Sequence, residues 1–413
     1  MSTYLTAAEA AATLGVSLPT LYSYVSRGML RSAPETIGRR RLYVAEEVRR
    51  LARRKADGKR AGKVAQKVLD WGVPVLESRI TLIADGRLVY RGRNAIELAR
   101  TSTLEETAAL LWDCRRSCFD ETPDPPIAPT SWRAWLKLAH ASAPHERTLA
   151  MLPAAAAHMP RLFASGKPAQ IETAVMLLRV LAAALVGAAP SRAPLHRQLA
   201  RAWGVRKRGH VELLRAALVL CADHELNAST FTVRCIASTG MHLFGAITGG
   251  LAALAGPRHC GETMLVTALF HEAKEAGDID RYVAARLARG DMQQRTILPG
   301  FGHMLYPNGD PRGAALLQML SQSVATRAER QALAEIDAIV RAARDATGLA
   351  PTIDFALSSV ERVLVLPPGA AFSMFALGRA TGWIAHAIEQ YDDGQLIRPR
   401  ARYIGPDEGA GAA

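Results

Sequence analysis

From about residue 103 onward, the chain consists of long Ala- and Leu-rich segments separated by short breaks that contain proline or glycine. Alanine and leucine are strong helix formers, whereas β-branched and aromatic residues dominate sheets. Aromatic residues make up only 6% of the chain, although 49% of its residues are apolar. This pattern predicts a mostly helical body with a sizeable core, and it excludes a β-sandwich and a largely disordered chain.

The 413 residues suffice for two or three domains, and the charge is spread unevenly along them. Residues 1–63 contain 13 Lys or Arg and five Asp or Glu, so a net charge of +8 out of +13 lies in this first stretch. The longer remainder is nearly balanced. A basic module in front of an almost neutral body indicates a polyanion partner for that module.

The basic module shows the pattern of two short helices joined by a glycine turn. Thr6 and Glu9 form a capping box before an apolar helical stretch that ends near Gly15. Ser17 can cap a second helix, which reaches Gly28. A helix, a short turn and a second helix make a helix-turn-helix, a common DNA-binding element.

A basic hairpin at residues 38–43 and a helix at 45–55 are predicted next, followed by a basic linker at 57–70. YLTAAEAAATLGVSLPTLYSYVSRGML and GRRRLYVAEEV resemble the winged helix-turn-helix of the MerR-type DNA-binding family over about residues 1–56. In that family the second helix enters the major groove and the wing touches phosphates; a purely assembling role is the alternative. The implied DNA contacts are Thr20, Tyr22, Ser23 and Arg27 on the second helix, and Arg39, Arg40 and Arg41 on the wing.

Cysteine usage and hydropathy predict a cytoplasmic protein without a membrane span. The five cysteines are odd in number and show no paired framework, and Cys114 and Cys118 lack the further ligand pair of a zinc site, so no metal is expected. The N-terminus lacks the basic and apolar regions of a signal peptide. The most apolar segment, 173–189, is short and contains Arg179, which favours a buried helix.

Two local signals mark the start of the body. Residues 77–92 alternate in polarity around Asp85-Gly86, which predicts a β-hairpin. Thr103 and Glu106 form a capping box that predicts the start of a helix.

Four later segments concentrate His, Asp and Arg. Each is weak alone, because a His in a Gly/Pro loop is more often structural, Asp354 fits a helix cap, and Arg398 and Arg400 fit a solvated surface. Together they suit a substrate with two or three carboxylates and the removal of a proton beside a carbonyl. The segments are 224–234 (HELNASTFTVR), 256–261 (GPRHCG), 299–312 (PGFGHMLYPNGDPR) and 353–400 (from IDF through GRATGW to LIRPR).

The order and spelling of these segments resemble the citrate synthase family over about residues 71–413. The resemblance implies an all-α fold whose large domain (71–260 and 366–413) and small domain (261–365) close over the substrates, here preceded by the small winged helix-turn-helix domain. It also implies a homodimer or higher homo-oligomer. The matching stretches are ESRITLIADGRLVYRG, HELNASTFTVR, GPRHCG, LPGFGHMLYPNGDPR, IDFALSSV and LGRATGWIAHAIEQYDDGQLIRPRARYIG.

By resemblance, the reaction would condense acetyl-CoA or propionyl-CoA with oxaloacetate and water to citrate or 2-methylcitrate and CoA, without a bound cofactor. Asp354 matches the base that removes the acyl α-proton, and His259 matches the donor to the resulting enolate. His303 matches the group that polarises the oxaloacetate ketone. The implied substrate-binding residues are His224, Arg312, Arg379 and Arg398, the last reaching across the dimer.

Two stretches depart from the usual family spelling. GPLHGGAN is replaced by a stretch that contains Arg258, Cys260 and Glu262, and the basic residue of RVYK is replaced by Pro307. These changes bear on acyl-CoA affinity and leave the matched catalytic residues in place. Two alternatives to the enzyme therefore stay open. One is a regulator that binds DNA through the first module and senses oxaloacetate or acyl-CoA through a degenerate synthase domain, and the other is an inactive structural paralogue.

Overall fold

The protein is described here by a computed structural model, in which the chain divides into two compact units, Met1–Glu77 and Ser78–Ala413. The expected linker at 57–70 lies outside the described residues. The described residues are 4–18, 21, 24–25, 30, 32–34, 41–49, 76–139, 142–160, 162–163, 166–288, 298–401 and 403–404.

The first unit contains a three-stranded sheet in the order β1-β3-β2, beside helix α1. The capping box is confirmed, since Thr6 N donates to the Glu9 carboxylate at 2.8 Å and Glu9 N donates to Thr6 Oγ1 at 3.4 Å. A hairpin is present, but it begins earlier than the predicted residues 38–43: β2 at Ser32–Pro34 pairs antiparallel with β3 at Arg41–Val44, and residues 35–40 lie outside the described residues. Residues 45–49 are helical, as predicted for the start of the next helix. The elements are β1 (Tyr4–Thr6), α1 (Ala7–Leu14), β2 (Ser32–Pro34) and β3 (Arg41–Val44).

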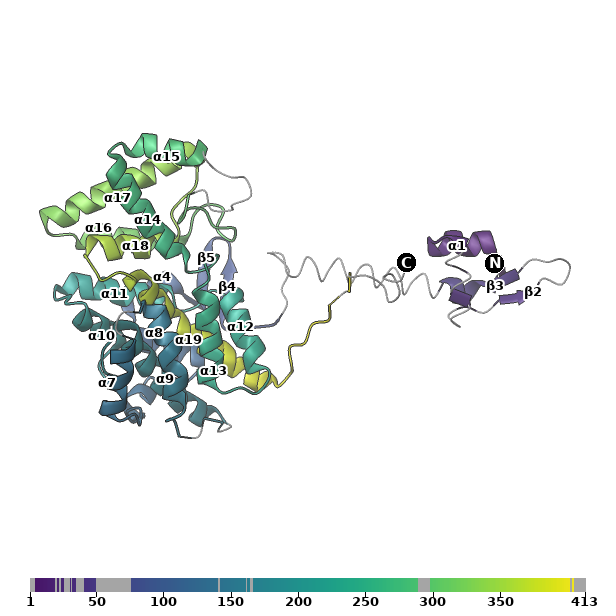
Figure 1. The fold of residues 1–413 in the computed structure, drawn as a ribbon, viewed down its shortest axis with the longest axis horizontal. Helices are drawn as coiled ribbons and strands as arrows, with labels where there is room; N and C mark the ends of the chain where they lie inside the picture. The colour runs from purple at the N-terminus through teal and green to yellow at the C-terminus, as the bar shows by residue number, and fades with distance from the viewer. Residues whose placement is uncertain are drawn as a thin grey trace. The chain divides into compact units, whose positions relative to one another are not determined.

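The second unit is the helical body that the sequence predicts. Figure 1 shows α14 to α18 gathered at one end of this unit and α7 to α10 at the other. The elements are β4 (Thr81–Ala84), β5 (Arg87–Tyr90), β6 (Arg93–Asn94), α4 (Ala95–Thr101), α5 (Leu104–Trp112), α6 (Cys118–Glu121), α7 (Pro129–Leu138), α8 (Pro144–Ala156), α9 (Lys167–Val186), α10 (Leu195–Ala202), α11 (Arg208–Leu220), α12 (Ala228–Ala237), α13 (Leu243–Leu254), α14 (Glu262–Ala276), α15 (Ile279–Ala288), α16 (Pro311–Ser323), α17 (Arg327–Thr347), α18 (Ile353–Val363) and α19 (Ala370–Asp393).

Both local signals at the start of the body are confirmed. Strands β4 and β5 pair antiparallel around Asp85 and Gly86, whose φ angles of 53° and 70° suit the tight turn. Helix α5 begins at a capping box, in which Thr103 N donates to the Glu106 carboxylate at 2.7 Å and Glu106 N donates to Thr103 Oγ1 at 3.2 Å.

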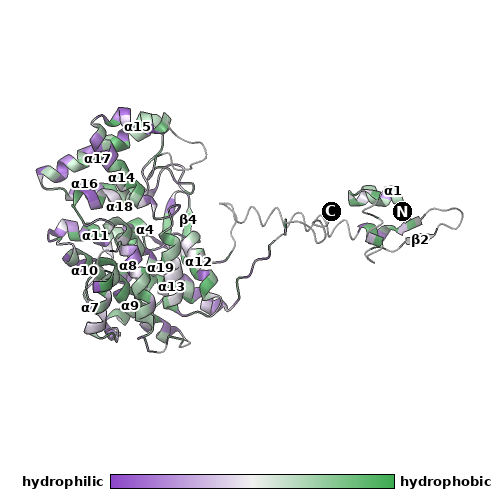
Figure 2. Ribbon diagram, viewed as in Figure 1, coloured by the Kyte–Doolittle hydropathy of each residue, from purple (hydrophilic) through white to green (hydrophobic). Residues whose placement is uncertain are grey.

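Helix α9 contains most of the apolar segment noted in the sequence. It is long and apolar enough to cross a membrane, but most of it is buried inside the unit. Arg179 in its middle donates from Nη1 to the carbonyls of Thr122 and Pro123, at 3.0 and 2.8 Å. The guanidinium of Arg179 is therefore hydrogen-bonded within the protein, and α9 is a core helix. The predominance of apolar residues along it is visible in Figure 2.

Helix α19 is the central element of the second unit. Nearly all of its side chains are buried, and it packs against α5, α9, α11, α12 and α18. Trp112 of α5 donates from Nε1 to the carbonyl of Thr381 in its middle, at 2.9 Å. Because α19 is covered by neighbouring helices, its side chains on the side of α11 lie in the interior of the protein.

Candidate active site

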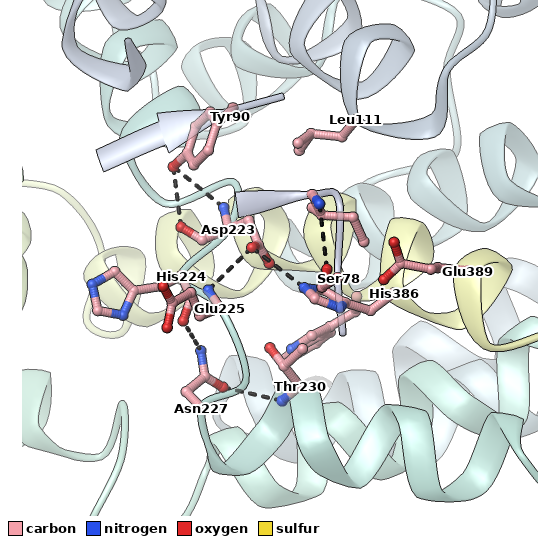
Figure 3. Close-up of polar contacts among 12 residues, drawn as sticks. Ser78, Tyr90, Leu111, Asp223, His224, Glu225, Asn227, Thr230, His386 and Glu389 are labelled. Carbon is pink, nitrogen blue, oxygen red and sulfur yellow. Dashed lines mark hydrogen bonds and ion pairs between the residues drawn. The ribbon is translucent and has the colours of Figure 1, made fainter. Parts of the chain in front are cut away.

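The loop after α11 carries the first predicted site residue, His224, and is held by Tyr90 and Asp223 (Figure 3). Tyr90 Oη lies 3.1 Å from the carbonyl of Asp223 and accepts from Asp223 N at 3.3 Å. The Asp223 carboxylate accepts from Glu225 N at 3.2 Å and contacts His386 Nε2 at 3.4 Å. The main chain on both sides of His224 is thereby fixed.

His224 is buried among other site residues. Its Nε2 lies 3.0 Å from Tyr306 Oη, and its ring meets that of His303 edge-on with centroids 5.2 Å apart. Burial, followed by the cations of Arg312 and Arg379, holds the pKa of His224 well below its ordinary value. His224 is therefore neutral near pH 7.

His259 lies between α13 and α14 and is oriented by Ser229 of α12. Its Nε2 is 2.8 Å from Ser229 Oγ, which also accepts from Trp383 Nε1 at 3.3 Å and donates to Asn227 Oδ1 at 2.7 Å. Burial, followed by Arg379, lowers the pKa of His259 to about 4. This histidine, too, is a neutral hydrogen-bonding group near pH 7.

His303 and Asp354 are brought together by a crossing of two loops. The carbonyl of Gly300 accepts from Thr352 N at 2.8 Å and from Thr352 Oγ1 at 3.2 Å, and Gly302 N donates to the carbonyl of Ala350 at 2.9 Å. The segment before His303 therefore runs beside the segment before Asp354. Burial, followed by Arg312, lowers the pKa of His303 to about 4.

Asp354 lies in the first turn of α18 and does not cap it, because the N-cap residue is Thr352. The Oδ1 atom of Asp354 is buried and has no hydrogen-bond partner among the described residues. Burial, followed by the nearby carboxyl of Glu262, raises the pKa of Asp354 to about 7. A carboxyl with this pKa both accepts and releases a proton at neutral pH, as a general base must.

Arg312 enters the site from the first turn of α16, paired with Asp310. Its Nε donates to Asp310 Oδ1 at 3.0 Å and its Nη2 to Asp310 Oδ2 at 2.8 Å, and both side chains are buried. Asp310 also caps α16 and accepts from Ile353 N at 3.1 Å. One carboxylate therefore connects the starts of α16 and α18.

Arg379 enters from α19, which approaches the end of α11 closely at two glycines. A Cβ on Gly378 would lie 2.5 Å from the carbonyl oxygen of Leu218, and one on Gly382 would lie 2.2 Å from Asp223 Oδ1. Arg379 Nε donates to the carbonyl of Cys221 at 3.0 Å. Its Nη2 is buried without a partner among the described residues, so this nitrogen has hydrogen-bonding capacity that the described residues do not use.

Six of the seven substrate and catalytic residues predicted from the sequence lie at this site. Arg398 is the exception: it is exposed in the segment after α19 and makes no hydrogen bond or ion pair within the described part of the chain. The predicted DNA contacts Thr20, Tyr22, Ser23, Arg27, Arg39 and Arg40, and the side chain of Arg41, lie outside the described residues.

Sequence reasoning missed the residues that orient the site. Ser229, Asp310 and Tyr306 lie inside the segments already singled out, but they resemble ordinary helix-start and loop residues. Asp223 precedes His224 directly, and its contact with His386 joins positions 163 residues apart. The only sequence signal that could have indicated Ser229, Asp310 and Tyr306 was their position within motifs rich in His and Arg.

Comparison with known proteins identifies the family of the chain. Residues 68–400 match the citrate synthase C-terminal domain, and residues 4–56 match a helix-turn-helix domain. The chain therefore belongs to the citrate synthase family and carries a helix-turn-helix domain at its N-terminal end.

Citrate synthase 2 of Bacillus subtilis is 37% identical over 201 residues, which are 48% of this chain and 52% of that protein. 2-Methylcitrate synthase 2 of Corynebacterium glutamicum is 34% identical over 193 residues, 46% of this chain and 49% of that protein. In these matches the chain spans about half the length of the curated relatives.

A solved structure is similar over a longer stretch. Citrate synthase of Thermoplasma acidophilum, in ternary complex with carboxymethyl coenzyme A and oxaloacetate, superposes with a TM-score of 0.70 at 26% identity. The superposition covers 81% of this chain and 95% of that one. The fold of the second unit is thus that of a citrate synthase.

Proposed function

We propose that the second unit condenses acetyl-CoA or propionyl-CoA with oxaloacetate and water, releasing citrate or 2-methylcitrate and CoA. The observation that carries the proposal is a cluster that brings together three neutral histidines, two buried guanidinium groups and a carboxyl whose Oδ1 atom is buried without a partner. The relative crystallised with oxaloacetate and a coenzyme A analogue supports the same pair of substrates.

Oxaloacetate binds through its charges. The unpartnered Nη2 of Arg379 pairs with one carboxylate of oxaloacetate. Arg312, held in a fixed orientation by Asp310, faces the second carboxylate. His224 and His303 are neutral, so they donate or accept hydrogen bonds without adding charge. A buried, unpartnered guanidinium nitrogen costs free energy in the empty site, and an anionic ligand removes that cost.

Asp354 begins the reaction by taking a proton from the acyl carbon beside the thioester. The acyl α-proton is weakly acidic, so the base must be strong, and a pKa near 7 makes Asp354 stronger than an exposed aspartate. The electron pair of the broken C–H bond moves onto the thioester oxygen, where His259 donates a hydrogen bond. One such preorganised donor contributes about 3–4 kcal/mol of transition-state stabilisation.

The donor role of His259 requires its Nδ1 to carry the ring proton. Its Nε2 is held at 2.8 Å by Ser229 Oγ, so the Ser229 hydroxyl proton turns from Asn227 to this nitrogen in the active tautomer. Trp383 Nε1 donates to Ser229 Oγ in either arrangement. The orientation of the Ser229 hydroxyl and the tautomer of His259 therefore change together.

The enolate carbon then attacks the ketone carbon of oxaloacetate, and the ketone oxygen takes a proton from His303, which is reprotonated at the expense of the proton that Asp354 removed. Water then adds to the thioester carbonyl: a C–O bond forms and the C–S bond breaks. The leaving sulfur takes one proton of the water to give CoA, and the new carboxyl group releases the other to solvent. Segment 261–365, which holds α14 to α18, is the part that we propose moves to close the site and exclude bulk water. We place the enzyme in the cytoplasm as a homodimer or higher homo-oligomer, without a resident cofactor.

The deciding experiment measures thiol release from acetyl-CoA and propionyl-CoA, with and without oxaloacetate. Turnover that requires oxaloacetate would establish the reaction, and the ratio of kcat/KM values would name the preferred acyl group. One methylene contributes about 1–3 kcal/mol of discrimination, so the ratio is readily measured. A folded protein that binds oxaloacetate but releases no thiol would refute the enzyme and favour a sensor.

A second candidate function is DNA-binding regulation, with the synthase domain sensing oxaloacetate or an acyl-CoA. The helix-turn-helix match over residues 4–56 and the net charge of +8 in residues 1–63 favour it. The two functions are compatible, because each rests on a different unit of the chain. Salt-sensitive binding to duplex DNA is the observation that this candidate requires.

A further inference from the structure

Glu262, the first residue of α14, holds a glycine that separates two helices of the site. Its Oε1 accepts from Gly300 N at 2.8 Å. A Cβ on Gly300 would lie 2.7 Å from Val266 Cγ2 on α14 and 2.9 Å from Phe355 Cβ on α18. Gly300 therefore sits tightly between the two helices, and its φ of 82° suits glycine.

The other face of Gly300 supports the start of α18. Its carbonyl accepts both the main-chain and side-chain donors of Thr352, the N-cap residue, and Asp354 follows two positions later. Farther along, Ser358 Oγ donates to the carbonyl of Thr263 at 3.1 Å. The start of α14 and the start of α18 are thus joined through Gly300, which the Glu262 carboxyl contacts directly and which lies two bonded steps from Asp354 through the N-cap residue Thr352.

The charges around Asp354 leave this pair of carboxyls short of cations. Arg312 faces it from α16 but is already paired with Asp310, and Arg379 faces it from α19. The carboxylate of Asp310 adds to the negative charge near Asp354, and the uncharged thiols of Cys221 and Cys260 are further titratable neighbours. Two carboxyls in such surroundings do not readily ionise together.

We propose that Glu262 is a positioning residue for Asp354: its carboxylate holds Gly300, and through Gly300 the start of α18, and it thereby keeps a second carboxyl near the buried Asp354 side chain. The catalytic meaning of this inference rests on the proposed function. The family stretch GPLHGGAN has alanine where this chain has Glu262, so a carboxyl at this position is a feature of this chain's own sequence.

The electrostatics of the pair agree with the geometry. After burial, Glu262 is the largest cause that raises the pKa of Asp354 to about 7. Burial also raises the pKa of Glu262, and its hydrogen bond from Gly300 N opposes that rise. A thioester α-proton is removed faster by a base of higher pKa, provided that the base is ionised.

Two substitutions separate the effect of the negative charge of Glu262 from the effect of its hydrogen bond with Gly300 N. Glu262→Gln keeps an oxygen that accepts from Gly300 N and removes the negative charge, whereas Glu262→Ala removes both. Glu275→Gln is the matched control, because Glu275 is exposed near the other end of the same helix. The titration of Asp354 is followed by ¹³C-carboxyl NMR, assigned with Asp354→Asn, and the pH dependence of kcat/KM is followed by thiol release.

We expect Glu262→Gln to move the titration of Asp354, and the acid limb of kcat/KM, to lower pH by about one unit. Glu262→Ala should add a loss of kcat, and Glu275→Gln should change neither. An unchanged titration in Glu262→Gln would overturn the proposal, and so would a loss of kcat in Glu262→Ala without a shift of the pH profile.

The proposal stays testable if Glu262→Gln fails to fold. In the wild type, the carboxyl signal of Glu262 should show a second inflection at the pH where Asp354 titrates, because each of two coupled groups reports its partner's ionisation, and Asp354→Asn should remove that inflection. No change there would overturn the proposal. The NMR titration needs no turnover, so shifted titrations without thiol release would refute the proposed reaction and leave the carboxyl pair established.

Discussion

Replacing Arg379 with methionine separates the role of its charge from its role in packing. In the empty site the guanidinium is buried and makes one hydrogen bond, from Nε to the carbonyl of Cys221, while Nη2 has no partner among the described residues. Removing a poorly paired buried charge in exchange for an apolar side chain of similar length is often neutral or stabilising. The free energy of unfolding of Arg379→Met without ligand should therefore stay within about 1 kcal/mol of the wild type.

The effect on oxaloacetate binding should be large. Losing a desolvated guanidinium–carboxylate contact costs 2–5 kcal/mol, and a loss of about 3 kcal/mol weakens binding about 150-fold. At an oxaloacetate concentration of 100 times the wild-type Kd, the ligand would stabilise the wild type by about 2.7 kcal/mol and the variant by about 0.3 kcal/mol.

Calorimetric titration and ligand-dependent thermal unfolding measure these two quantities. Arg341→Met, an exposed arginine on α17, is the matched control and should behave as the wild type. A variant that is folded by circular dichroism and binds oxaloacetate within threefold of the wild type would show that Arg379 does not bind the substrate carboxylate. The reasoning about the open Nη2 would then be wrong.

Three further predictions follow from the same observations. The pKa of Asp354 in the folded chain, about 7, lies above that of an exposed aspartate, so its contribution to stability is present below pH 4 and is lost as the pH rises through 7. Asp354→Asn should therefore abolish turnover. In urea denaturation it should raise the free energy of unfolding by up to about 4 kcal/mol at pH 8, with little change at pH 4. Equal effects on the free energy of unfolding at both pH values would contradict this prediction. Charge reversal at Arg39, Arg40 and Arg41 should weaken DNA binding and flatten its salt dependence, and salt-insensitive binding by the wild type would refute the electrostatic argument. Arg398→Ala should lower turnover, and mixing it with Asp354→Asn should restore about a quarter of the activity if Arg398 acts across a dimer, whereas no recovery on subunit exchange would place Arg398 outside the partner's site.

The motifs predicted the site well where a residue's chemistry is unusual for its surroundings. His224, His259 and His303 lie in loops rich in glycine, asparagine or proline, and Arg379 interrupts an apolar helix, so each stood out from the sequence. The structure brings these residues together through contacts between segments far apart in the chain.

The supporting residues were not predictable, because their side chains serve ordinary local roles as well. Asp310 is a normal helix N-cap, and only the fold shows that the same carboxylate also holds Arg312 and Ile353 N. Ser229 follows the cap of α12 and gains its meaning from His259, 30 residues later. Glu262 was visible as a departure from the family spelling, but its contact with Gly300 depends on the crossing of two loops.

The central position of α19 has a consequence for how the protein folds during synthesis. This helix follows in the chain all the helices that it packs against, and its hydrogen bond with Trp112 spans 269 residues. At ribosomal rates of 5–20 residues per second, Thr381 is synthesised about 15–50 s after Trp112, so their hydrogen bond cannot form before then. The surfaces of α5, α9 and α11 that pack against α19 stay uncovered during that time, so the nascent chain exposes apolar surface until α19 emerges.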